Sequence, residues 1–244
     1  MADRVARVVW AKPRRRIGSG AILAAFVAAV VVLFTGSLTS SRPARAAGVS
    51  SPQQAVSAEV NALLNKMTVA EKFGQLEVSG PTGANGTAGD VLLNEARNGQ
   101  VGSVLDMVGV ANINELQKAA LQSRLQIPII AALDVIHGYK TMFPVPIAEA
   151  SSWDPALVEN DEAVSADEAT ADGLKWTFNP MVDISRDPRW GRVVEGAGED
   201  PYLGSAIAAA KVRGYQGTDF SAPDKMAATV KHFAGYGAPV AGRE

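Results

Sequence analysis

The stretch from Phe178 to Tyr202 concentrates charged side chains in a segment with neither helical nor strand periodicity. Its charged residues are Asp183, Arg186, Asp187, Arg189, Arg192, Glu195, Glu199 and Asp200. A long irregular segment inside a compact domain is usually functional or disordered, and apolar anchors such as Met181 and Trp190 argue against disorder. Guanidinium groups donate in a fixed fork and carboxylates accept pairs of O–H bonds, so this mixture suits a ligand with many hydroxyl groups. The pattern fits equally well a loop whose charges only pair with one another, and it leaves both interpretations open.

Two other motifs stand out, the first of them at the end of the apolar run from Ile127 to Leu133. They are LDVIHG, from Leu133 to Gly138, and VKHFAGYG, from Val230 to Gly237. Together with RDPRWGR in the charged stretch, in this order and spacing, they strongly resemble the N-terminal half of family 3 glycoside hydrolases, the β-glucosidase group. The resemblance runs from about Val56 to the last residue. It implies a β-glucoside or oligosaccharide substrate and a first domain built as a (β/α)8 barrel of the TIM type.

The resemblance assigns sugar-binding roles to five residues. It implies that Asp134 binds hydroxyl groups at the non-reducing subsite, and that Arg192, Lys231 and His232 contact the hydroxyls of the same sugar. Glu244 stands where the family has a supporting acid near the Arg and Lys. The residue types suit these roles, because a carboxylate accepts from two adjacent hydroxyls, Lys donates only, and a neutral His does both.

The resemblance further implies a retaining mechanism with two carboxylates. In the family, the nucleophile is an Asp in an SDW- or SDH-like motif on a later barrel strand, and the acid/base Glu belongs to a second domain. Neither region occurs in these 244 residues, and the family gives Asp183, Asp187, Glu195 and Glu199 structural roles. We therefore assign no catalytic residue here. We expect the full-length enzyme to release terminal non-reducing β-D-glucosyl residues, while this chain supplies the sugar-binding part.

Two alternatives to a β-glucosidase remain. Tyr236 stands where the β-N-acetylglucosaminidase branch of the family carries a His that serves as acid/base. Its presence favours the β-glucosidase or the β-xylosidase branch. A non-catalytic sugar-binding remnant that keeps Asp134, Arg192 and Lys231 is the second alternative.

The composition excludes several other classes of function. There are 23 Lys and Arg against 25 Asp and Glu, but residues 1–46 hold eight of the basic and one of the acidic side chains. The rest of the chain therefore carries 15 basic and 24 acidic residues, and a domain this acidic is a poor nucleic-acid binder. Without Cys, and with two His far apart, the sequence predicts no disulfide, no metal site and no cofactor.

The first 46 residues have the three parts of a secretory signal. A basic leader is followed by the apolar run from Ala21 to Phe34 and by small residues up to Ala46. The pattern predicts cleavage after Ala46 and a secreted or periplasmic protein, with residues 47–244 as the barrel domain. An uncleaved signal anchor is the alternative, and only then would the protein bind a membrane. Neither the export route, Sec or twin-arginine, nor the oligomeric state follows from the sequence.

The segments that must position the site alternate between strands and helices. Apolar runs predict strands at 101–105, 127–133, 175–179 and 225–232. Asp-Pro pairs at 154–155 and 200–201 predict helix starts, and Thr68 with Glu71 and Asn112 with Glu115 predict capping boxes. Such alternation indicates parallel strands, and the proposed site residues all follow strands, at the end where α/β barrels carry their sites. We expect about the first half of a (β/α)8 barrel.

Four further side chains are expected to serve the structure. We expect His137 to bond its own loop, Trp190 to pack under the charged stretch, and Trp153 and Trp176 to lie in the core.

Overall fold

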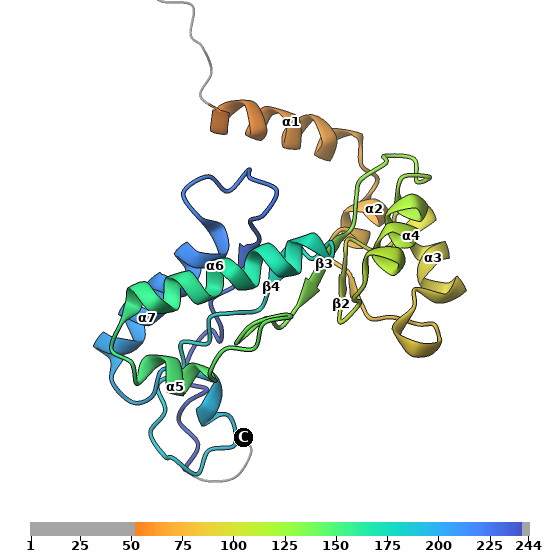
Figure 1. The fold of residues 1–244 in the computed structure, drawn as a ribbon. Helices are drawn as coiled ribbons and strands as arrows, with labels where there is room; N and C mark the ends of the chain where they lie inside the picture. The colour runs from red at the N-terminus through yellow and green to blue at the C-terminus, as the bar shows by residue number, and fades with distance from the viewer. Residues whose placement is uncertain (1–51, 241–244) are drawn as a thin grey trace, which may run out of the picture. The chain divides into compact units, whose positions relative to one another are not determined.

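The computed structural model describes residues 52–240 (Figure 1). The predicted signal peptide, residues 1–46, and the proposed site residue Glu244 lie outside the described residues. The helices are α1 (Pro52–Lys66), α2 (Val69–Gly74), α3 (Gly89–Arg97), α4 (Val110–Ala120), α5 (Pro146–Ala150), α6 (Pro155–Ala171) and α7 (Pro201–Gln216), with 3-10 turns at Ala84–Gly86 and Val193–Glu195. The strands are β1 (Val78–Ser79), β2 (Ser103–Leu105), β3 (Ile130–Leu133), β4 (Trp176–Thr177) and β5 (Ala227–Ala228). In this part of the chain, no helix combines the length and the apolar character needed to cross a bilayer.

The five strands form one parallel sheet in the order β1-β2-β3-β4-β5. Each strand therefore pairs with the next strand in the sequence, and at least one helix lies between each pair of neighbours, as in the wall of a (β/α)8 barrel. The predicted fold class, part of a TIM-type barrel, is confirmed. The four predicted strands correspond to β2–β5, which are shorter than expected. Strand β1 was missed, because two residues beside a glycine-rich segment leave no periodic pattern.

Four of the helices pack in two pairs beside the sheet (Figure 1). Helices α3 and α4 contact each other, as do α6 and α7. The main core contains Leu92 of α3, Leu116 of α4, Val104 of β2 and Ala131 of β3, each at most 2% exposed. This core fixes β2 and β3, and hence the loop that carries Asp134 directly after β3.

The Asp-Pro pairs start their helices as predicted. The Oδ1 atom of Asp154 accepts the backbone N–H groups of Ala156 and Leu157, at 3.0 and 3.2 Å, and α6 begins at Pro155. Asp200 caps α7 in the same way. These signals are local, because the side chain satisfies N–H groups only two and three residues ahead.

The two predicted capping boxes have different outcomes. Thr68 and Glu71 form theirs at the start of α2, with reciprocal bonds of 3.2 and 2.8 Å. The box at Asn112 is wrong, since α4 already begins at Val110 and the Asn112 amide donates to the Val108 oxygen at 3.0 Å. A side-chain amide inside the first turn can donate backwards as well as accept, so the spacing alone did not locate the helix start.

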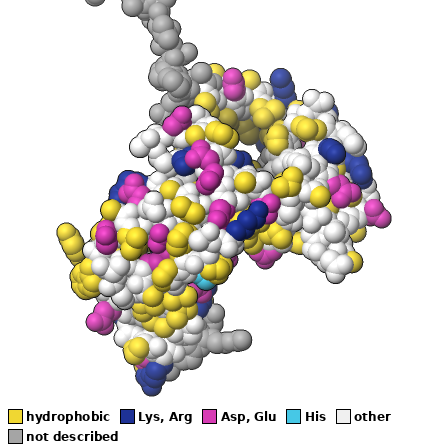
Figure 2. Space-filling view, in the orientation of Figure 1, with side chains coloured by type: hydrophobic (Ala, Val, Ile, Leu, Met, Phe, Trp, Pro, Cys, Tyr) yellow, Lys and Arg dark blue, Asp and Glu magenta, His cyan; other side chains and the backbone are white. Residues whose placement is uncertain are grey.

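Several apolar side chains remain on the surface (Figure 2). The apolar residues Val56, Val60 and Leu64 of helix α1 are exposed. Trp153 is 69% exposed, so its expected place in the core is wrong. It lies between the turn that follows α5 and the Asp154 cap of α6, and its φ angle is 56°. Trp176, at the sheet, is half-buried, and its Nε1 donates to Thr229 at 2.6 Å.

A buried ion cluster joins α5, α6 and α7. The ammonium of Lys211 donates to Glu149 at 2.6 Å and also to Glu162, and the three residues are at most 4% exposed. One oxygen of each carboxylate has no hydrogen-bond partner among the described residues. Burial raises the pKa of Glu162 to about 7 and also raises the pKa of Glu149, although the charge of Lys211 opposes both shifts.

Candidate functional site

The site begins with an ion pair between the ends of β3 and β5. Asp134 directly follows β3, and Lys231 lies three residues beyond β5. The Nζ atom of Lys231 donates to Oδ1 of Asp134 at 2.9 Å, with 48% of the Asp134 side chain and 12% of the Lys231 side chain exposed. The parallel register brings both strand ends to one edge of the sheet, and the carboxylate stays open to solvent while the ammonium lies beneath it.

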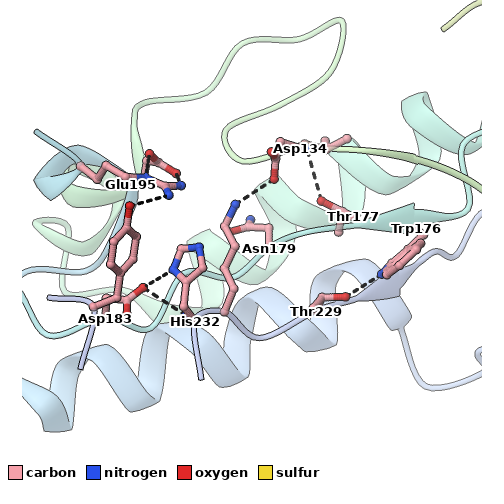
Figure 3. Close-up of polar contacts among 12 residues, drawn as sticks. Asp134, Trp176, Thr177, Asn179, Asp183, Glu195, Thr229 and His232 are labelled. Carbon is pink, nitrogen blue, oxygen red and sulfur yellow. Dashed lines mark hydrogen bonds and ion pairs between the residues drawn. The ribbon is translucent and has the colours of Figure 1, made fainter. Parts of the chain in front are cut away.

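Buried polar groups hold the backbone next to Asp134. The N–H of Val135 donates to Oγ1 of Thr177 at 3.2 Å, and its C=O accepts from the hydroxyl of Tyr215 at 2.5 Å. The same hydroxyl accepts from Nδ2 of Asn179 at 2.6 Å. Thr177, Asn179 and Tyr215 are fully buried. The peptide groups of Val135 are thus fixed from β4 and from α7, and Asp134 is anchored by its neighbour. Figure 3 draws the contact with Thr177 beside Asp134.

Arg192 is held by a two-point contact within the charged stretch. Its Nε and Nη2 atoms donate to the two carboxylate oxygens of Glu195 at 2.6 and 2.7 Å. These bonds lower the pKa of Glu195 and raise that of Arg192. The Nη1 atom donates to the Tyr236 hydroxyl at 3.4 Å. Such bidentate pairs restrict the guanidinium to one orientation.

His232 is held by Asp183. Beyond β4 and β5, backbone pairing continues: Val182 donates to the Lys231 oxygen at 2.7 Å, and Lys231 donates to the Pro180 oxygen at 3.0 Å. This pairing sets Asp183 beside His232. The Oδ2 atom of Asp183 lies 3.2 Å from the backbone nitrogen of His232 and 2.8 Å from its Nδ1.

Tyr236 connects the two halves of the site. Its ring meets the His232 ring edge-on at 4.6 Å and the Trp190 ring edge-on at 5.4 Å, and Arg192 lies 5.4 Å from its centroid. Gly237 then passes so close to the backbone of Ile184 that a Cβ there would lie 2.2 Å from its oxygen. The aromatic packing therefore fixes the loop after β5 against the charged stretch.

Four of the five predicted site residues lie in this network, and Glu244 lies outside the described residues. Asp134 and Lys231 touch, His232 follows Lys231, and Arg192 is joined to His232 through Tyr236. The prediction missed the supporting groups Asp183, Asn179, Tyr215 and Tyr236 as members of the site. Asp183 was noted only as one of many charges, and no spacing in the sequence distinguished it.

The alternative interpretation of the charged stretch, as a self-paired loop, is partly right. Asp187 binds Arg189 at 2.5 Å, and Arg192 binds Glu195 within the same stretch. Trp190 is 1% exposed and packs the loop, as expected. His137 also bonds its own loop as expected, with Nδ1 3.1 Å from the oxygen of Phe143.

The arrangement offers donors and acceptors to a neutral, hydroxyl-rich molecule. Asp134 accepts, Lys231 and Arg192 donate, and His232 has one ring nitrogen not engaged by Asp183. A pocket of about 230 Å³ is lined by His232, Asp183, Arg186 and Phe233 among others, and its lining does not include Asp134, Arg192 or Lys231. Within residues 52–240, no group of three His, Asp or Glu side chains is placed to hold a metal ion.

Comparison with known proteins places the chain in a family. Residues 68–242 match the glycosyl hydrolase family 3 N-terminal domain. The periplasmic β-glucosidase of Salmonella typhimurium is 42% identical over 194 residues, which cover 78% of this chain and 25% of that protein. The β-xylosidase of Formosa agariphila is 37% identical over 132 residues, which cover 49% of this chain and 18% of that protein.

A solved structure is similar in both sequence and fold. The β-glucosidase of Listeria innocua, determined with glucose and, as a mutant, with laminaribiose, is 44% identical with a TM-score of 0.67. The match covers 74% of this chain and 27% of that one. The chain thus spans about a quarter of the length of these β-glucosidases. Since the family match extends over well more than half of its residues, the protein belongs to glycosyl hydrolase family 3.

Proposed function

We propose that this chain forms the sugar-binding part of a retaining β-glucosidase, with Asp134, Arg192, Lys231 and His232 binding the terminal glucosyl residue. The observation that carries the proposal is the Lys231–Asp134 contact at 2.9 Å at the carboxyl ends of β3 and β5. It presents a half-exposed acceptor beside a fixed donor, the pairing that two adjacent sugar hydroxyls require. Glu244 belongs to the same proposal as a supporting acid.

The relatives support the choice of a glucoside. The similar Listeria innocua enzyme binds glucose and laminaribiose, according to its solved complexes. A β-xylosidase is the second candidate, because the Formosa agariphila relative carries that activity in its name. Xylose lacks the hydroxymethyl group of glucose, so comparing the affinities for the two sugars distinguishes the candidates.

Export and processing complete the proposal. The similarity to a periplasmic enzyme and the basic, apolar and small-residue parts of residues 1–46 support a secreted or periplasmic location, with cleavage after Ala46. Residues 47–244 then make up the barrel portion. Mass spectrometry of the exported protein tests this, and a mature N-terminus other than residue 47 would contradict the cleavage site.

The decisive experiment separates binding from hydrolysis. We expect calorimetric titration of the chain with glucose to give heat, and Asp134→Asn to remove most of it. We also expect no release of 4-nitrophenol from its β-glucoside, because the family's nucleophile and acid/base motifs are absent from this sequence. If the folded chain gives no heat with glucose or xylose, the sugar site is wrong. If it hydrolyses the aryl glucoside, a catalytic pair lies among these residues.

A further inference from the structure

The structure assigns to Asp183 the role of a positioning residue, which holds His232 with its hydrogen on Nδ1 and so makes Nε2 an acceptor for a hydroxyl hydrogen of the sugar. The inference about the sugar rests on the proposed function, whereas the inference about the imidazole does not. Asp183 is buried and is not one of the proposed sugar-binding residues, so this role is additional to theirs.

The first step is the direction of the hydrogen bond. The Oδ2 atom of Asp183 lies 3.2 Å from the backbone nitrogen of His232, which can only donate, and 2.8 Å from Nδ1. A carboxylate oxygen that already accepts one N–H acts as an acceptor for the ring as well. The Nδ1 atom therefore carries the hydrogen, and in the neutral ring Nε2 has a free lone pair.

The second step is rigidity. Asp183 is 8% exposed, and its backbone is tied to the segment after β5 by the bond from Val182 to Lys231 at 2.7 Å. The ring of Tyr236 lies edge-on to the imidazole at 4.6 Å and 80°. The imidazole of His232 is thus held by a hydrogen bond at Nδ1 and by the edge-on contact with the Tyr236 ring. A rotation of the ring that exchanges its two nitrogens would disrupt both contacts.

The third step is the direction of Nε2. In Figure 3 the imidazole turns this nitrogen away from Asp183, toward the side on which Asp134 and Glu195 lie. Within the part of the chain that the structure describes, Nε2 has no hydrogen-bond partner. Together with the carboxylate of Asp134, the site then has two acceptors near the ammonium of Lys231.

This arrangement limits the ligand chemistry. A group that faces Nε2 must donate a hydrogen, as a hydroxyl does, and a carboxylate or a fluorine in its place cannot. The site therefore favours a neutral glycosyl residue over a uronic acid whose carboxylate would face Nε2 of His232. A site built to bind a hydroxyl discriminates strongly against an analogue that lacks the donor, because its polar group is left unpaired.

Nitrogen NMR of the chain tests the inference directly. The sequence contains two histidines, His137 and His232, so the imidazole region holds two rings, and His137→Gln assigns them. With the imidazoles in their neutral form, we expect His232 to carry a hydrogen on Nδ1 and none on Nε2. The ring of His137, whose Nδ1 faces a backbone oxygen, is expected in the same form and serves as an internal reference.

Two variants make the test specific. We expect Asp183→Asn to change the balance of hydrogen between Nδ1 and Nε2 in His232 alone, and to lower glucose affinity by about tenfold or more, the scale of one lost charged hydrogen bond. Asp187→Asn is the matched control, since this carboxylate lies in the same stretch but binds Arg189. It should leave both the His232 signals and the glucose affinity unchanged.

The outcomes separate this inference from the proposed function. If wild-type His232 carries its hydrogen on Nε2, or if Asp183→Asn leaves its signals unchanged, the positioning role is overturned. A wild-type spectrum with the hydrogen on Nε2 overturns the role by itself, even if Asp183→Asn fails to fold. If the Nδ1–H form is present and responds to Asp183→Asn but glucose does not shift Nε2, the positioning role stands and the proposed sugar site is wrong.

Discussion

The hydroxyl of Tyr215 lies 2.5 Å from the backbone oxygen of Val135, the residue that directly follows Asp134. A side chain near the end of α7 thereby supports the loop after β3, across 80 positions of the sequence. The Asp134 carboxylate is half-exposed, whereas the phenol that holds the backbone next to it is fully buried and out of reach of a ligand.

Tyr215→Phe is expected to weaken both stability and sugar binding. It leaves the Val135 oxygen and the Asn179 amide without their buried partner, at a cost of about 1–3 kcal/mol in the free energy of unfolding. Urea unfolding and calorimetric titration with glucose measure the two effects. Tyr202→Phe is the control, because Tyr202 is 85% exposed and should change stability by less than about 0.5 kcal/mol. Equal effects of the two substitutions would contradict the support of Asp134 by Tyr215.

Arg192→Lys is expected to lower glucose affinity by about tenfold. Lysine keeps the charge but cannot reproduce the fork that engages both oxygens of Glu195, and the loss of one charged hydrogen bond costs about 1.5–3 kcal/mol. Titration calorimetry measures the change. Arg189→Lys provides the comparison, since its guanidinium also engages a carboxylate but its side chain is 68% exposed. If both variants bound glucose with the wild-type affinity, the proposed sugar-binding role of Arg192 would be contradicted.

Stability is expected to fall as the pH rises from about 4.5 to about 7. The pKa of Glu162 is raised from 4.5 to about 7 in the folded protein, so this carboxyl is protonated when folded but ionised when unfolded within that window. Its contribution to stability is present below pH 4.5 and is lost as the pH rises to the folded pKa. Glu149, whose pKa is also raised by burial, adds to the same slope.

The substitution Glu162→Gln should reduce this slope without abolishing it. Free energies of unfolding measured at about pH 5, 6 and 7 give the slope for the wild type and the variant. The exposed Glu159→Gln, on the same helix, serves as the control. An unchanged slope in Glu162→Gln would show that the buried carboxyl is ionised throughout.

Removing the central cation of the cluster should destabilise the protein strongly. Lys211→Met keeps a long side chain but leaves Glu149 and Glu162 buried without a positive partner. Breaking a buried pair in this way typically costs about 3–5 kcal/mol. Thermal unfolding measured near pH 8, above the folded pKa of Glu162 of about 7, tests it, and the deficit should shrink near pH 4.5, where both carboxyls can protonate. A variant as stable as the wild type near pH 8 would contradict the ionic character of the cluster.

The sequence predicted those features of the fold that depend on near neighbours. The starts of α6 and α7 were located because Asp154 and Asp200 cap N–H groups two and three residues ahead. Strand lengths were overestimated, because an apolar run such as 225–232 shows burial, whereas the paired residues depend on the neighbouring strand. Trp153 was misplaced because its hydrophobicity predicted burial, although nothing local shows which way a side chain between two helices points.

The proposed binding residues were found through motifs, but their supports were not. Asp183 and His232 are 49 positions apart, and Tyr215 and Val135 are 80 apart. The first contact depends on the parallel pairing that continues beyond β4 and β5, and the second depends on the packing of α7 beside the loop after β3. A single amino-acid sequence contains no signal for contacts between such distant residues, so only the structure identified these pairs.

The distance along the chain between Asp134 and Lys231, 97 residues, has a consequence for the kinetics of folding. Contacts between residues far apart in sequence form slowly, because a long loop must close before they stabilise the chain. The capacity to bind a sugar should therefore emerge only after β3, β4 and β5 have paired, and an early intermediate with formed helices should lack it. Binding of a ligand at this site during folding would therefore show when the contacts between residues far apart in the sequence have formed.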